Sequence, residues 1–140
     1  MKLLGIDYGR RRIGVAATDE TGVIIHGCTT IDLKKTANPV TALSDIITQE
    51  SPGAIVFGVP LGPQDEETDM SREIRAFAKR LVEEASLKMP VHFVDESFSS
   101  VHAQRRLFYK KKKHRRNKKN IDLFAACTIL ESFQREQQCE

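Results

Sequence analysis

The first part of the chain alternates between apolar runs and short polar turns, which predicts three strands. Residues 2–8 and 13–17 are apolar runs separated by the polar turn 9–12, an arrangement typical of two tightly joined strands. A third run, residues 22–31, is rich in β-branched side chains, which favour strands. Because the connections are short, we expect the three strands to form an antiparallel meander.

The rest of the chain alternates between helical and strand patterns. The predicted elements are helices over residues 39–49, 71–85, 100–109 and 121–135, and strands over residues 54–59 and 91–94. An antiparallel meander followed by helix-linked parallel strands gives a mixed five-stranded sheet with helices on its faces. We therefore expect a single α/β domain over residues 1–140 with the plan of the ribonuclease-H-like fold.

The composition of the chain gives no sign of a membrane span, a secretory signal or a disulfide framework. No run approaches the roughly 18 apolar residues that a membrane span needs, and Asp7 falls where a secretory signal would keep its apolar region. Cys28, Cys127 and Cys139 stand at spacings that indicate neither a zinc site nor a disulfide framework. The sequence therefore predicts a cytoplasmic protein with no membrane partner.

Positive charge is concentrated in one segment. Residues 101–120 contain ten Lys or Arg and no Asp or Glu, although the formal net charge of the whole chain is only +3. Such a basic segment on an otherwise acidic domain is typical of a nucleic-acid-binding surface. The predicted contacts are Arg105, Arg106, Lys110, Lys111, Lys112, Lys113, Arg115, Arg116, Lys118 and Lys119. The alternative is a solvated loop, but twenty positions without one acid favour binding.

Two candidate carboxylate positions lie at strand ends. Asp7 shares a strand face with Leu3 and Gly5, and the alternative is that it only starts the following turn. Asp95 and Glu96 end the last predicted strand, where ligands collect in parallel sheets. The alternative there is that Asp95 or a nearby Ser caps the following helix.

A third carboxylate, Asp122, lies at the start of the last predicted helix. With Asn120 as the expected N-cap, Asp122 aligns with the apolar positions Ala125 and Ala126 and is expected to face the sheet. The alternative is a favourable helix-dipole interaction of about 0.3–1 kcal/mol. Carboxylates converging from two strands and this helix suit hard cations such as Mg²⁺, which stabilise the attacking and leaving oxygens in phosphodiester hydrolysis.

Four segments of the chain resemble the YqgF (RuvX) family, whose members are described as Holliday junction resolvases and as nucleases that process the 5′ end of pre-16S rRNA. The segments are GIDYGRRRIGVA at residues 5–16, IVFGVP at 55–60, VDESFSS at 94–100 and IDLFAACTIL at 121–130. The resemblance implies a ribonuclease-H-like fold with an acidic Mg²⁺ or Mn²⁺ site. By position, its metal ligands are Asp7, Asp95, Glu96 and Asp122, of which Asp7, Glu96 and Asp122 are the predicted catalytic residues. Arg12 also matches the motif and is predicted to contact nucleic acid.

Two departures from the family pattern concern activity more than fold. Ser97 stands where the family usually has an Arg after the acidic pair, and residues 61–68 lack the usual Asp-Gly. If that Arg holds a phosphate or orients a carboxylate, activity is expected to be weaker here or to use another cation.

The expected function is metal-dependent hydrolysis of phosphodiester bonds in structured nucleic acid, with 5′ processing of pre-16S rRNA as the first interpretation. Resolution of Holliday junctions in recombination and repair is an alternative, and a non-catalytic nucleic-acid-binding module is another. Cutting both strands of a symmetric junction would call for a homodimer, whereas processing one RNA end is compatible with a monomer. Sugar kinases and actin-like ATPases share the opening pattern but need two lobes, and 140 residues provide one.

Overall fold

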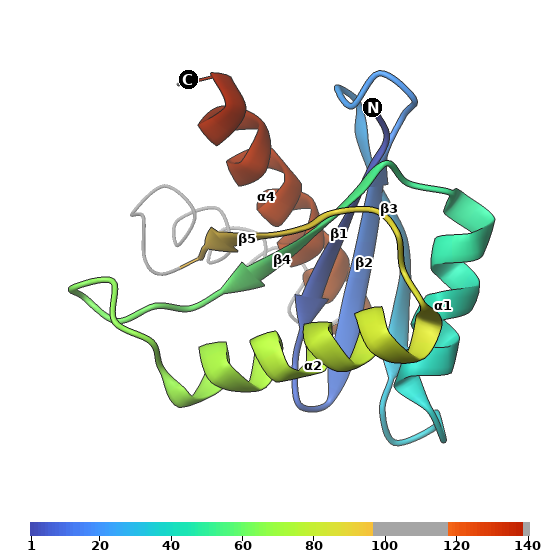
Figure 1. Cartoon of the computed structure of the whole chain (residues 1–140), viewed down its shortest axis with the longest axis horizontal. Coiled ribbons are helices and arrows are strands. Elements are labelled where there is room, and N and C mark those ends of the chain that lie inside the picture. The colour runs from blue at the N-terminus through green and yellow to red at the C-terminus, as the bar shows by residue number, and fades with distance from the viewer. Residues whose placement is uncertain (97–117, 139–140) are drawn as a thin grey trace.

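The computed structural model describes residues 1–96 and 118–138, which form a five-stranded sheet covered by three helices (Figure 1). The elements are β1 Leu3–Tyr8, β2 Arg12–Thr18, β3 Ile25–Asp32, α1 Pro39–Glu50, β4 Ala54–Val59, α2 Asp69–Ala85, β5 Val91–Asp95 and α4 Lys118–Gln138. The helix expected over residues 100–109 lies outside the described residues, as does most of the basic segment.

The strand order confirms the predicted mixed sheet. The order is β3-β2-β1-β4-β5, with antiparallel pairing of β1 to β2 and of β2 to β3. Parallel pairing joins β1 to β4 and β4 to β5. The carboxyl ends of β1, β4 and β5 therefore lie at one edge of the sheet, where the candidate site is expected.

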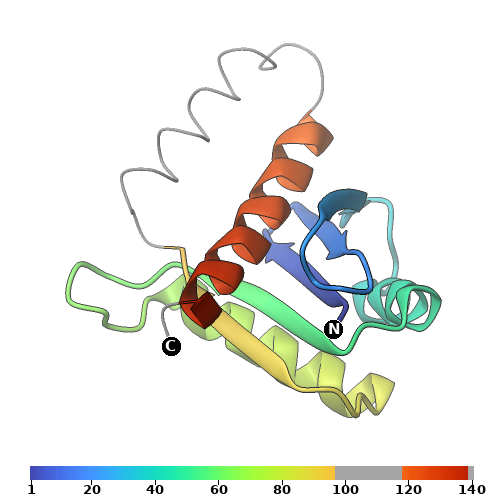
Figure 2. The ribbon, with the colours of Figure 1, turned by 90° about the horizontal axis from the view of Figure 1, so that it is seen from above.

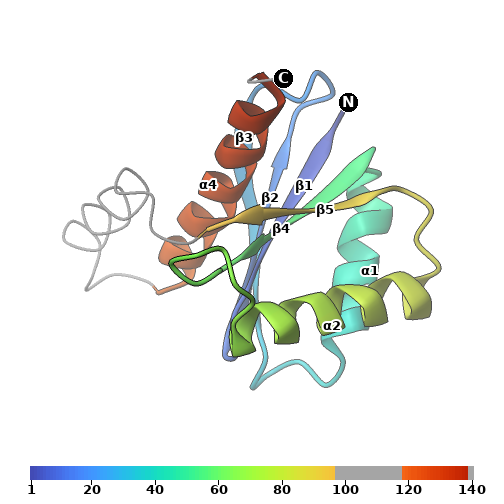
Figure 3. The same cartoon turned by 60° about the vertical axis from the view of Figure 1, so that its left-hand side comes forward.

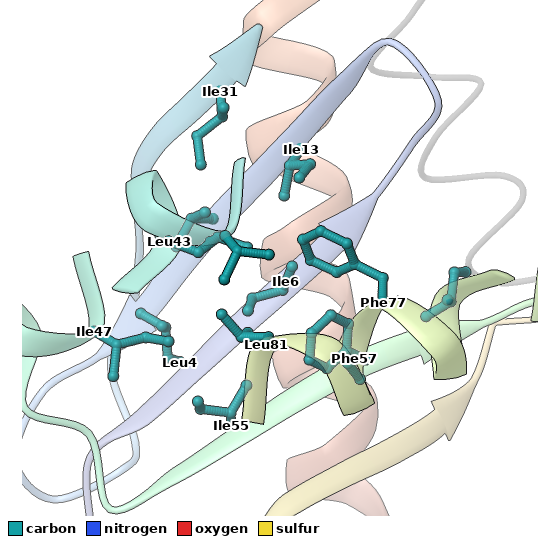
Figure 4. Close-up of a cluster of buried hydrophobic side chains, with 14 of the residues drawn as sticks. Leu4, Ile6, Ile13, Ile31, Leu43, Ile47, Ile55, Phe57, Phe77 and Leu81 are labelled. Carbon is teal, nitrogen blue, oxygen red and sulfur yellow. The ribbon is translucent and has the colours of Figure 1, made fainter. Parts of the chain in front are cut away.

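Different helices cover the two faces of the sheet (Figures 2 and 3). On one face, α1 and α2 cover a core in which Leu4, Ile6 and Phe57 are fully buried (Figure 4). On the other, α4 packs its Ala126, Ile129 and Leu130 against the sheet. Each fully buried Leu, Ile or Phe of this kind stabilises the fold by about 1.5–3 kcal/mol. Because side chains alternate between the two faces along a strand, the residues between them face α4.

Local capping sets the helix boundaries. The Asn38 side chain accepts hydrogen bonds from the backbone of Val40 and Thr41 at the start of α1. Thr68 and Ser71 form a reciprocal capping box, so α2 begins at Asp69 and not at the predicted residue 71.

The predicted starts of β3 and α4 are also wrong. Strand β3 begins at Ile25 and not at residue 22, because the Asp19 carboxylate accepts hydrogen bonds from Val23 and Ile24 and closes a turn there. Helix α4 begins at Lys118, so Asn120 lies inside its first turn and is not the N-cap. Lysine is a good helix former, which allows the helix to extend toward the basic segment.

Candidate active site

Asp7 lies between two glycines on the neighbouring strands. It pairs with Gly14 of β2, and the pairing of Ile6 with Phe57 of β4 brings Gly58 level with it on the other side. Asp7 shares the α4 face with Gly5, because a Cβ added at Gly5 would meet Leu130 of α4. The carboxylate of Asp7 therefore projects from the middle of three adjacent strands, between two positions that carry no side chain.

The space above Gly14 is filled by Asp122. A Cβ at Gly14 would lie 2.7 Å from the carbonyl carbon of Asp122 and 3.1 Å from its Cβ. Only a glycine on β2 allows α4 to approach this closely. The contact brings Asp122 next to Gly14, the residue that pairs with Asp7 in the sheet. It agrees with the prediction that Asp122 faces the sheet.

The space above Gly58 is filled by Glu96. A Cβ at Gly58 would lie 2.7 Å from the Cγ of Glu96 and 2.7 Å from the Cδ1 of Ile129. The backbone N–H of Glu96 donates to the carbonyl of Val59 at 2.9 Å, so the residue continues the pairing of β5 with β4. Both carboxylate oxygens of Glu96 are shielded from solvent.

Asp95 points the other way. Phe93, two residues earlier on β5, packs in the core on the α1 and α2 face, and the alternation of a strand gives Asp95 the same side. Asp95 is exposed. Of the acidic pair, Glu96 therefore shares a face with Asp7 and Asp122, and Asp95 does not.

Arg12 holds the carboxylate of Asp122. Its Nε donates to Oδ2 of Asp122 at 3.0 Å, and the two side chains are only 19% and 24% exposed. Burial raises the pKa of Asp122 from its ordinary value, and the hydrogen bond and charge of Arg12 partly oppose that rise. This ion pair connects the start of α4 to β2. Arg12 therefore contacts Asp122, one of the predicted metal ligands.

The oxygen donors suit a hard cation, but they are not gathered into a coordinating group. Within residues 1–96 and 118–138, no three His, Cys, Asp or Glu side chains lie close enough together to hold a metal ion. What the fold provides is a common face, with glycines clearing the space on both sides of Asp7. Carboxylate oxygen is the ligand type that Mg²⁺ and Mn²⁺ prefer.

Most of the basic residues predicted to contact nucleic acid lie outside the described residues. Lys118 and Lys119 open α4, and the others, from Arg105 to Arg116, lie outside the described residues together with Ser97. Sequence reasoning did not identify Gly14 and Gly58 as parts of the site. A glycine within an apolar strand signals a close approach of another segment, and both positions carried that signal.

Comparison with known proteins places the chain in a family. The profile of the family described as "RuvX: Holliday junction resolvase" matches residues 1–136. The chain belongs to the RuvX family. Within this nuclease family, a "Putative pre-16S rRNA nuclease" of Crocosphaera subtropica is 35% identical over 130 residues, which cover 93% of this chain and 90% of the relative. A relative of the same name from Nitratidesulfovibrio vulgaris is 39% identical over 133 residues, covering 95% and 92%.

Solved structures similar to this RuvX-family chain confirm the ribonuclease-H-like fold. Thermus thermophilus RuvC in complex with a Holliday junction substrate has a TM-score of 0.57 at 14% identity, covering 98% of this chain and 96% of that one. The fowlpox virus Holliday junction resolvase has a TM-score of 0.55 at 16% identity, covering 99% of both chains. None of the described helices is both long and apolar enough to span a membrane.

Proposed function

We propose that this chain hydrolyses phosphodiester bonds of structured nucleic acid with a divalent cation held by Asp7, Glu96 and Asp122. The observation that carries the proposal is the pair of glycines flanking Asp7: Asp122 occupies the space above Gly14, and Glu96 occupies the space above Gly58. Two close approaches from distant parts of the chain thus bring carboxylate-bearing residues to both sides of one strand-end aspartate.

Charge supports the choice of a divalent cation. Asp7, Glu96 and Asp122 bring three carboxylates to one face of the sheet, and carboxylate oxygens are the ligands that Mg²⁺ and Mn²⁺ prefer. Such a cation supplies Lewis-acid stabilisation of the negative charge that develops on the phosphate oxygens. Within the chain, Arg12 fixes the orientation of Asp122 through Oδ2, and the carboxylate oxygens of Glu96 are shielded from solvent. Asp95 is the least suited of the four predicted ligands, because it lies on the opposite face.

The substrate is inferred from the relatives. Because relatives at 35% and 39% identity over most of their length are named for pre-16S rRNA, we propose 5′ processing of that RNA in the cytoplasm. The family description and the similar resolvase structures favour a second candidate, resolution of Holliday junctions. The second reaction requires two active sites related by a two-fold axis, so a monomer would be restricted to the first.

A cleavage assay tests the proposal. Wild type and Asp7→Asn are incubated with a pre-16S rRNA 5′ leader and with a four-way DNA junction, in Mg²⁺, in Mn²⁺ and in EDTA. We expect wild type to cut one substrate in metal only and Asp7→Asn to cut neither. Binding without cleavage by the wild type would favour the non-catalytic interpretation, and cleavage that persists in EDTA would exclude the metal mechanism.

A further inference from the structure

Two loops beside the candidate site carry exposed cations that the proposed chemistry does not use. Arg10 and Arg11 form the turn between β1 and β2, and Lys34 and Lys35 follow the end of β3. The two loops lie side by side at the lower edge of the molecule in Figures 1 and 3. A backbone hydrogen bond of 2.9 Å from Leu33 to the carbonyl of Arg11 ties them together.

The second loop is a built turn that presents its lysines. Oδ1 of Asp32 accepts a hydrogen bond from the backbone of Lys34 at 2.9 Å, and the Asp32 carbonyl accepts one from the backbone of Lys35 at 3.0 Å. The first of these bonds lowers the pKa of Asp32 most, and the nearby charges of Arg11, Lys35 and Arg12 lower it further. The backbone of the turn thus already engages the carboxylate of Asp32.

Three of the cations are available to a ligand. Arg10 has a partner, since its Nε lies 3.4 Å from Oε1 of Glu73. In the described part of the chain no carboxylate lies within ion-pair distance of Arg11, Lys34 or Lys35, and all three are exposed. Three solvated cations on two linked loops are an anion-binding surface by their charge alone.

This surface, here named the β-turn patch and defined as Arg11, Lys34 and Lys35, is continuous with the candidate site. Arg11, the last residue of the turn between β1 and β2, directly precedes Arg12, the residue bound to Asp122. Arg12 also pairs across the sheet with Asp32. The end of β1, the start of β2 and the end of β3 lie at the same edge of the sheet, so a nucleic-acid strand bound at the carboxylates can extend toward the patch.

We infer that the β-turn patch binds the phosphate backbone of the nucleic-acid arm that leaves the site on the β3 side. This inference rests on the proposed function, because it takes the site of Asp7, Glu96 and Asp122 as the place of cleavage. The patch is separate in sequence from the basic segment at residues 101–120. Backbone contacts of this kind position the substrate and read no sequence.

The test compares two variants that remove the same charge from different places. Lys34→Gln/Lys35→Gln removes two charges from the patch, and Lys79→Gln/Lys88→Gln removes two exposed lysines from α2 and from the loop before β5. Both are made on the Asp7→Asn background, so that the substrate stays intact. Binding of a fluorescein-labelled four-way DNA junction and of an RNA hairpin is measured by anisotropy over a range of salt concentrations.

We expect the patch variant to weaken binding about 5- to 50-fold near 0.1 M salt, and to reduce the slope of log K against log salt by about 1 to 2. Adding Arg11→Gln should weaken binding further. Equal slopes for the two double variants, or no salt-sensitive binding to either probe, would overturn the inference. Comparison of the DNA junction with the RNA hairpin also shows which of the two nucleic acids the patch binds. Failure of the proposed function is seen separately, as Asp7→Asn cutting at the wild-type rate.

Discussion

The guanidinium of Arg12 on β2 donates to the carboxylate of Asp122 on α4 at 3.0 Å, across 110 residues of sequence. Both residues belong to segments that carry the family resemblance, and the hydrogen bond joins them at the edge of the candidate site. The same helix turn rests on Gly14. The start of α4 is thus fixed to β2 by one ion pair and one close backbone approach, and these two contacts can be removed separately.

Substitution of Arg12 by Gln should raise the pKa of Asp122 further. Burial raises that pKa and Arg12 lowers it, so the substitution leaves the burial contribution less opposed. The chemical shift of the Asp122 carboxyl carbon, followed by NMR against pH, measures this directly. Arg10→Gln is the control, because Arg10 pairs with Glu73. An Asp122 pKa that is unchanged or lower in Arg12→Gln would contradict the prediction.

The sign of the effect on stability follows from the same pKa. Since the folded-state pKa of Asp122 exceeds its value in the unfolded chain, this carboxyl stabilises the fold only at acidic pH. Its contribution is lost as the pH rises through the folded-state pKa. Because a metal ligand must be deprotonated, we also expect Mn²⁺ binding to Arg12→Gln to need a higher pH than binding to wild type.

Substitution of Gly14 by Ala should displace the start of α4. The new Cβ would lie 2.7 Å from the carbonyl carbon of Asp122. Because that atom belongs to the backbone, the contact can be relieved only by moving the helix and not by rotating a side chain. We expect a loss of about 1–3 kcal/mol in the free energy of unfolding, measured by urea denaturation, together with loss of cleavage.

A matched glycine on β3 provides the control for that experiment. A Cβ at Gly27 would lie 3.4 Å from the side chain of Leu123 on the same helix, which is ordinary contact. Gly27→Ala should therefore change the free energy of unfolding by no more than about 0.5 kcal/mol. Equal effects of the two substitutions would show that the approach of α4 at Gly14 is not specially close.

The thiol of Cys28 should react slowly in the folded protein. Burial raises its pKa to about 11, with a smaller contribution from the charge of Glu50. Since the thiolate is the reactive form, only about one thiol in a thousand is ionised at pH 8. Iodoacetamide labelling of the Cys28 peptide, followed by mass spectrometry, should be much slower in buffer than in urea. Equal rates in the two conditions would contradict the burial of this residue.

The mixed five-stranded sheet could be predicted from sequence because the evidence for its strands and helices is local. Strand and helix periods are strong in this chain, and short connections between the first three strands leave few alternatives to a meander. The position of Asp122 on the inner face of α4 follows from the 3.6-residue period in the same way.

The rest of the site depends on contacts that no local pattern specifies. Asp95 and Glu96 are neighbours, and a strand sends neighbours to opposite faces. Which of them faces α4 is decided by the register of β5 on β4, where Val59 pairs with Asp95. The partner of Arg12 is likewise set by the packing of α4. Because α4 begins at Lys118, the prediction of Asn120 as its N-cap was wrong.

The measurement that tests the account most directly is the single-turnover cleavage rate of Glu96→Gln beside that of Asp95→Asn, each at saturating Mg²⁺. The two substitutions remove the same charge from adjacent residues on opposite faces of the sheet. If the three carboxylates on the α4 face form the metal site, Glu96→Gln should lose about 100-fold or more in rate, while Asp95→Asn should stay within about threefold of wild type. A wild-type rate for Glu96→Gln, or an equal loss in both variants, would contradict the proposed site.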